Sequence, residues 1–174
     1  MCFSDSSGNS CMTFDGQTAR ELGKKSRFNH QFGSLCEKNG VVYGGGGRED
    51  VNTIEFYIGD QWHYNPAYDN PAGFRESTCL TVPEGILYFG YPKTYLFNTE
   101  SLTWKSTGDA WVYGAKIRFV NNQIWSYQGY YNNYNLRLYW DGDRVTEGDR
   151  KMLPIGYEAP KPVILDEDEF ALIE

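Results

Sequence analysis

Few segments of this 174-residue chain have residue types and spacing that could support a reaction. The glycine run at 44–47 lacks the Gly-Lys-Ser/Thr tail of a phosphate-binding loop, so we expect close backbone packing there and no nucleotide. His30 and His63 are the only histidines, and two imidazoles alone do not make a copper site. His30 is expected to orient a loop. We therefore expect no catalytic residue, no metal and no cofactor.

Aromatic side chains are the more prominent chemical feature, because they make up 17% of the residues, with fourteen Tyr and five Trp. Tyr and Trp present rigid amphipathic surfaces that suit recognition, and binding residues are expected on loops carried by a rigid scaffold. The candidate binding residues in polar loops are Arg48, Asp50, Tyr64, Tyr68, Trp111, Tyr130, Tyr131 and Tyr134. The alternative, that the tyrosines pack across the bases of these loops, stays open.

The four cysteines show neither CxxC nor Cys/His metal spacing, so a zinc site is not expected. Cys2 and Cys11 flank a Ser/Gly/Asn loop that would close as a disulfide in an oxidising compartment. Cys36 and Cys79 are expected to be ordinary small core residues. No signal peptide is recognised at the start of the chain. An extracellular location is favoured only if the chain is a fragment with Cys2 and Cys11 paired, and a cytoplasmic one otherwise.

The charge of the chain narrows the class of partner. The net charge is −7 and the sequence pI is about 4.9, and no stripe of basic residues occurs. Nucleic acid is therefore not an expected partner, since binding phosphates requires such a stripe. No apolar run approaches the length of a membrane span, so membrane insertion is not expected either.

The segments that must position these loops repeat along the chain. Three segments each contain a short apolar strand with a glycine at or near its end, and each follows a tight turn. They are residues 40–47, 85–91 and 123–129. A polar loop, an aromatic strand, a second turn and a last strand follow each of them. Successive equivalent positions, Gly45, Gly90 and Gln128, lie 45 and 38 residues apart. Four antiparallel strands per period of this length predict an all-β propeller with one blade per repeat.

The repeat sets the expected domain boundaries. A polar segment over 1–10 precedes a propeller over 11–174, which divides into a half-blade at 11–27, blades at 28–74, 75–113 and 114–153, and a half-blade at 158–174. Helix formers are sparse. The nearest helical candidate, Thr18 to Lys25, is interrupted by Gly23 and is expected to form one turn at most.

The repeat resembles the kelch family, whose fold is the β-propeller shared with the central domain of galactose oxidase. A kelch blade carries an apolar strand, a Gly-Gly pair, a Tyr and then a Trp. The matching positions are Gly45, Gly46, Tyr57 and Trp62 in the first whole blade, Gly90 and Trp104 in the second, and Gly129 in the third. The two tryptophans are expected to pack between blades. A valine at Gly45 is expected to damage folding more than one at Gly47, which lies at the loop edge.

The resemblance implies five to seven blades, which is more than this chain supplies. It is therefore expected to be part of a longer protein; a closed four-blade ring and an open arc are the alternatives. Open blade edges predict self-association. We expect a non-catalytic module that binds a protein partner, of unknown identity, through rim loops. The superfamily resemblance implies the alternative, a carbohydrate-binding or carbohydrate-oxidising propeller.

Overall fold

The all-β prediction is confirmed by a computed structural model that describes residues 2–3, 10–14, 16–21, 25–30, 33–47, 51–91, 93–109, 116–120, 123–127 and 134–152. Its strands form three four-stranded antiparallel sheets and one three-stranded sheet. The described part of the chain contains no α-helix, only the 3-10 turn η1 (Pro66–Tyr68).

Strands follow chain order within every sheet. The three-stranded sheet contains β1 (Cys2–Phe3), β2 (Ser10–Phe14) and β3 (Ala19–Glu21). The first four-stranded sheet contains β4 (Ser34–Lys38), β5 (Val41–Gly45), β6 (Ile54–Ile58) and β7 (Gln61–Tyr64). The second contains β8 (Arg75–Val82), β9 (Gly85–Tyr91), β10 (Thr94–Asn98) and β11 (Thr103–Gly108). The third contains β12 (Lys116–Val120), β13 (Gln123–Tyr127), β14 (Tyr134–Trp140) and β15 (Val145–Met152).

Two-residue turns with positive φ set the register of the first four-stranded sheet. Asn39 and Gly40 have φ of 54° and 80°, and Gly59 and Asp60 have φ of 57° and 59°. Positive φ at both central residues matches the twist of the flanking strands, which is why Asn-Gly and Gly-Asp suit these hairpins. The expected hairpin after the Asn-Gly turn therefore forms with Lys38 opposite Val41.

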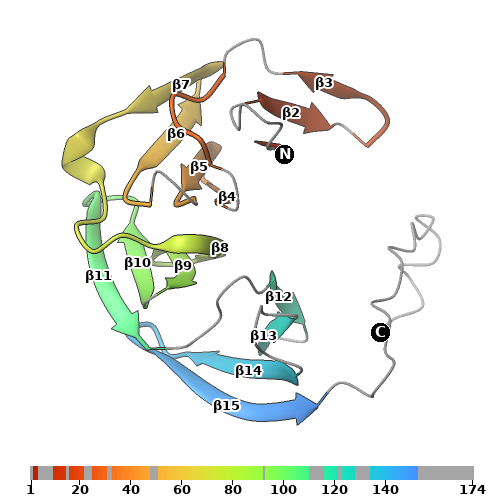
Figure 1. Cartoon of the computed structure of the whole chain (residues 1–174), viewed down its shortest axis with the longest axis vertical. Helices are drawn as coiled ribbons and strands as arrows, with labels where there is room; N and C mark the ends of the chain where they lie inside the picture. The colour runs from red at the N-terminus through yellow and green to blue at the C-terminus, as the bar shows by residue number, and fades with distance from the viewer. Residues whose placement is uncertain are drawn as a thin grey trace.

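The four sheets stand side by side in an arc (Figure 1). In each four-stranded sheet the first strand, β4, β8 or β12, lies on the inside of the arc, and the last, β7, β11 or β15, lies on the outside. Each connector therefore runs from the outer strand of one sheet to the inner strand of the next. Because the strands of one sheet alternate in direction, their connections fall at two opposite ends.

Aromatic residues fill the joint between the first and second four-stranded sheets. Trp104 of β11 lies at its centre, with ring centroids 4.9 Å from Phe97, 5.1 Å from Phe74 and 5.5 Å from Tyr88. Its indole N–H donates to the Tyr68 carbonyl at 2.6 Å. The expectation that Trp104 packs between sheets is confirmed. Trp62 is half-buried on the other face of its sheet, where it packs against Tyr57.

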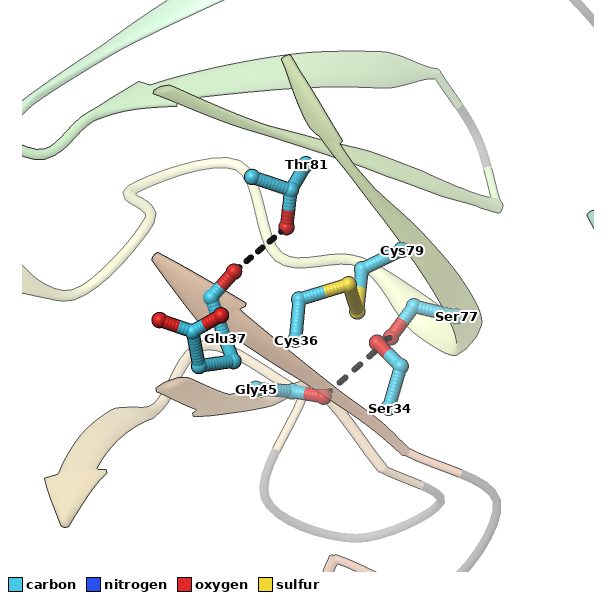
Figure 2. Close-up of a disulfide and its surroundings, with 7 residues drawn as sticks. All are labelled: Ser34, Cys36, Glu37, Gly45, Ser77, Cys79 and Thr81. Atoms are coloured by element: carbon cyan, nitrogen blue, oxygen red, sulfur yellow. Dashed lines mark hydrogen bonds between the residues drawn. A yellow bond between two sulfur atoms is a disulfide. The ribbon is translucent and has the colours of Figure 1, made fainter. Parts of the chain in front are cut away.

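A disulfide joins the inner strands of the same two sheets, which corrects the expectation for Cys36 and Cys79. The two cysteines are bonded across β4 and β8, with their Cα atoms 6.0 Å apart (Figure 2). Hydrogen bonds flank the bond: Thr81 Oγ1 donates to the Glu37 carbonyl at 2.7 Å, and Ser77 Oγ donates to the Gly45 carbonyl at 3.2 Å. The spacing of the two cysteines, which are 43 residues apart, does not indicate this pairing.

Mainly aliphatic residues fill the joint between the second and third four-stranded sheets. Its buried members are Val82, Leu87, Phe89 and Leu96 on one side and Ile124, Leu136, Leu138 and Val145 on the other. At the surface of the joint the Trp140 indole N–H donates to Glu84 Oε2 at 3.2 Å, and Lys105 pairs with Asp143. Packing at both joints makes the three sheets one continuous body.

Three local expectations differ from the structure. Residues 19–21, where at most a helical turn was expected, form β3, because they pair with Met12–Phe14 of β2. β1 lies within the expected polar segment 1–10, and its register places Cys2 opposite Cys11. Gly47, expected at a loop edge, is buried with φ of 150°, so a side chain there would also be strained. Gly129 and residues 158–174 lie outside the described residues.

Removing the disulfide should weaken the joint between the first two four-stranded sheets. We expect Cys36→Ser, Cys79→Ser and the double variant each to lower the free energy of unfolding by about 2–4 kcal/mol, because the reduced chain has a larger unfolded ensemble. Urea titration followed by tryptophan fluorescence measures this loss. Unfolding midpoints equal to that of the unaltered protein would contradict it.

Adding a side chain at Gly45 should be costly, because a Cβ there would lie 3.0 Å from Tyr88 Cε1 and 3.1 Å from Phe74 Cζ. We expect Gly45→Val to cost on the order of 1–3 kcal/mol. Gly44→Val is the control, since its nearest neighbour, 3.1 Å from the Cβ position, is the flexible end of Leu35. Equal losses in a denaturant titration would show that Gly45 is not the tighter position.

Candidate binding surfaces at the two rims

The strands present two ends, which differ in what they carry. The loop rim is the end at which β5, β7, β9, β11 and β13 finish, and the turn rim is the opposite end, at which β4, β6, β8, β10, β12 and β14 finish. All eight candidate binding residues lie in the connections that leave the loop rim, or in the strand residues next to them. The described strands that flank these residues, from β5 to β14, therefore end or begin at one rim.

Tyr64 and Tyr68 are the candidates whose side chains the structure describes. Tyr64 packs edge-on against Phe28, at a centroid distance of 4.5 Å, and its hydroxyl donates to Asp69 Oδ2 at 2.7 Å. Tyr68 packs against Phe56 at 5.9 Å. Both are half-buried, so the alternative of packing across the loop base holds for these two. Of the remaining six, Tyr134 begins β14, and five lie outside the described residues: Arg48, Asp50, Trp111, Tyr130 and Tyr131.

A buried network anchors the base of the loop rim. Glu55 of β6, which is 1% exposed, accepts from the Arg27 N–H at 2.9 Å and from the Phe28 N–H at 3.2 Å. His30 Nε2 lies 2.8 Å from Glu55 Oε2, and its Nδ1 lies 2.9 Å from the Gly46 carbonyl oxygen. Both ring nitrogens of His30 therefore lie within hydrogen-bond distance of an oxygen atom. His30 orients the loop as expected, and Glu55 is the partner that the sequence did not indicate.

The surroundings of Tyr64 perturb its ionisation. The hydrogen bond to Asp69 raises the pKa of Tyr64 to about 12, and partial burial adds to this, while the nearby Arg27 guanidinium lowers the pKa. That guanidinium lies 5.2 Å from the centre of the Tyr64 ring. The effect holds the residue as a neutral phenol that ties the 65–74 connection to the sheet.

The turn rim carries a cleft that the sequence did not reveal. It lies between the second and third four-stranded sheets and has a volume of about 590 Å³. Its lining residues are Leu80, Thr81, Val82 and Pro83 at the end of β8, Gln123 and Ile124 at the start of β13, and Arg137, Leu138, Tyr139 and Trp140 of β14. Ligand pockets typically measure about 300–1,000 Å³ and have mainly apolar walls with a few polar groups, which is the chemistry of this cleft.

The turn beside the cleft is rigid and negatively charged. Asp141 Oδ1 accepts from the backbone N–H groups of Asp143 and Arg144, at 2.8 Å each. These bonds hold the pKa of Asp141 below its usual range, the one with Arg144 contributing most. Asp141 is therefore a carboxylate in neutral solution, fixed next to Trp140.

Neither rim shows metal-site chemistry in the part of the chain that the structure describes. No group of three or more His, Cys, Asp or Glu side chains there could hold an ion together. No helix among the described residues is long and apolar enough to cross a membrane.

Comparison with known proteins supports the fold only. No protein-family model matches the chain, and no curated protein matches it in sequence. The solved structure of YjhT is similar to it with a TM-score of 0.62 at 11% identity, over 76% of this chain and 54% of that one. The chain thus spans about half the length of that structure. Likeness at this identity shows a shared arrangement of sheets and says nothing of a shared activity.

The Tyr64 phenol should keep its proton to about pH 12. Replacing Asp69 with Asn removes the negative acceptor, so we expect the pKa of Tyr64 to fall toward that of an ordinary tyrosine. NMR of ring-labelled tyrosine, with Tyr64→Phe to assign the signal, measures the shift. Because the folded state binds this proton more tightly than the unfolded state, its stability should fall as the pH rises from about 10 to 12. An unchanged titration in Asp69→Asn would contradict the role given to Asp69.

Proposed function

We propose that the chain is a non-catalytic module that binds a protein partner through its loop rim. The observation that carries the proposal is that every strand flanking the eight candidate residues ends or begins at that rim. Binding residues commonly lie on loops held by a rigid scaffold, and Tyr, Trp and Arg dominate the energetics of protein interfaces. The disulfide and the two packed joints supply the rigidity.

We propose further that the sheets are blades of a kelch-type propeller. The support is the arrangement of three four-stranded sheets in an arc with their first strands innermost (Figure 1), together with the Gly45-Gly46, Tyr57 and Trp62 pattern. Propellers place their connections at two rims, whereas their strands fill the space between. Substitutions in the connections can therefore change binding while the sheets stay intact.

The proposed place of action is an oxidising compartment. Disulfides form and persist in secreted or periplasmic surroundings and are rare in the cytosol. The Cys36–Cys79 bond supports this assignment.

Substitution of the aromatic residues expected at the loop rim tests the function. We expect Trp111→Ala/Tyr130→Ala/Tyr131→Ala to weaken partner binding at least tenfold, since hot-spot aromatics each contribute about 2 kcal/mol or more. Affinity purification with the unaltered protein and the variant, compared by quantitative mass spectrometry, nominates partners, and calorimetry with the purified partner measures the change in Kd.

Asp60→Ala/Glu100→Ala, at two exposed positions on the turn rim, is the matched control and should bind normally. Circular dichroism and thermal melting confirm that each variant is folded. If no protein depends on the loop-rim residues while the folded chain retains sugars on a glycan array, the carbohydrate-binding alternative replaces the proposal.

A further inference from the structure

The tightest group of basic residues in the sequence precedes β4. It consists of Lys24, Lys25 and Arg27, in a chain whose net charge is −7. Lys25 and Arg27 are exposed, and they belong to the described segment 25–30, which leads toward the end of the sheet at which β4 begins. That end is the loop rim. The rim therefore includes an exposed cation, Arg27, that is not among the eight candidate binding residues.

Hydrogen bonds fix the backbone of Arg27 to the first four-stranded sheet. Its N–H donates to Glu55 Oε1 at 2.9 Å, and the N–H of Phe28 donates to the other oxygen of the same carboxylate at 3.2 Å. On the preceding residue, the hydroxyl of Ser26, which is 4% exposed, donates to the Phe28 carbonyl oxygen at 3.0 Å. Because Glu55 belongs to β6, these bonds hold Arg27 at a constant position relative to the sheet.

Two aromatic rings hold the side chain of Arg27. The guanidinium carbon lies 5.2 Å from the centre of the Tyr64 ring and 5.5 Å from that of the Phe28 ring. These rings pack edge-on against each other, and the bond from the Tyr64 hydroxyl to Asp69 fixes the first of them. A cation within about 6 Å of a ring centre is attracted to the face of the ring. This attraction orients the guanidinium and leaves its N–H donors available.

The N–H donors of Arg27 face solvent. Arg27 is exposed, and among the described residues it has no ion-pair partner. The two carboxylates in its surroundings are bonded to other donors: Glu55 to the backbone beside it, and Asp69 to the Tyr64 hydroxyl and, at 3.4 Å, to the Ile54 N–H. They reduce the local positive charge, but the guanidinium keeps its donors for a group from outside the chain.

We propose that Arg27 binds a carboxylate of the partner protein, on an Asp or Glu side chain that docks at the loop rim. A guanidinium presents its N–H donors in a planar fork that matches the two oxygens of a carboxylate. The two rings orient this fork before binding, so less conformational freedom is lost when the partner arrives. Arg is also enriched among the residues that dominate protein interfaces. The inference rests on the proposed loop-rim function and adds to it the chemistry of the group that is recognised.

A pair of small probes tests the proposal by NMR titration of the full ¹⁵N-labelled chain. N-acetyl-glutamate N-methylamide carries the carboxylate, and N-acetyl-glutamine N-methylamide is its neutral match. Arg27→Lys assigns the Arg27 Nε–H signal. Arg20 and Arg75 are the internal controls, because both are exposed and neither lies over an aromatic ring of the described residues. We expect the glutamate probe to half-saturate the Arg27 signal at an about fivefold lower concentration than the control signals, since only Arg27 is pre-oriented.

Replacement of one ring tests the origin of this preference. Phe28→Leu keeps an apolar side chain but removes one aromatic face, so we expect the half-saturating concentration at Arg27 to rise about threefold. Thermal melting confirms that the variant is folded. The proposal is overturned if Arg27, Arg20 and Arg75 respond alike to the glutamate probe, if the glutamine probe shifts Arg27 equally, or if folded Phe28→Leu responds as the unaltered chain does.

Failure of this proposal and failure of the loop-rim function are distinguishable. The probe titration uses no partner protein, whereas the loop-rim test measures partner binding by the variant of Trp111, Tyr130 and Tyr131. A selective Arg27 response with unchanged partner binding in that variant would refute the loop-rim function and leave a carboxylate site. Weakened partner binding with no selective Arg27 response would refute only the role given to Arg27.

Discussion

The close approach of β4 and β8 is the constraint on which the rest of the described structure depends. A single four-stranded sheet of this size cannot bury both of its faces, so its apolar residues need a second sheet at close range. Gly45, at the end of the adjacent β5, helps the two sheets to come close, because a side chain there would meet Phe74 and Tyr88. The Cys36–Cys79 bond then ties the strands covalently, and the Trp104 cluster fills the widening space toward the outer strands.

The same joint determines what the rims can do. With the sheets locked, connections at either end are carried by fixed strand termini, and their relative positions change little. Glu55 extends this effect to the loop rim, since a buried carboxylate holds two backbone N–H groups and the His30 imidazole on one side of β6. Burying such a charge is costly unless it is fully hydrogen-bonded, so the segment around Arg27 to His30 has little freedom to leave the sheet.

The two rims differ in chemistry although the same strands support them. Aromatic residues concentrate in the loop-rim connections, and short turns rich in Gly, Asn and Asp close the other end. The cleft beside Trp140 lies between two sheets at the end that these tight turns close. The strict antiparallel order of each sheet is the structural origin of this difference between the two rims.

Local pattern in the sequence was sufficient for the strands, the hairpins and the positions of Gly45 and Trp104, because strand alternation, turn conformation and repeat spacing act over a few residues. It was insufficient for β3, which is a strand only because β2 pairs with it. The Cys36–Cys79 bond, the Glu55–His30 network and the cleft each join residues that are 25 or more positions apart. Such contacts depend on how sheets pack against one another, and the spacing of residues along one chain does not encode that distance directly. The residue pattern was thus enough to define the four-stranded units, because strand alternation and turns are local, whereas packing between the units decided which residues meet.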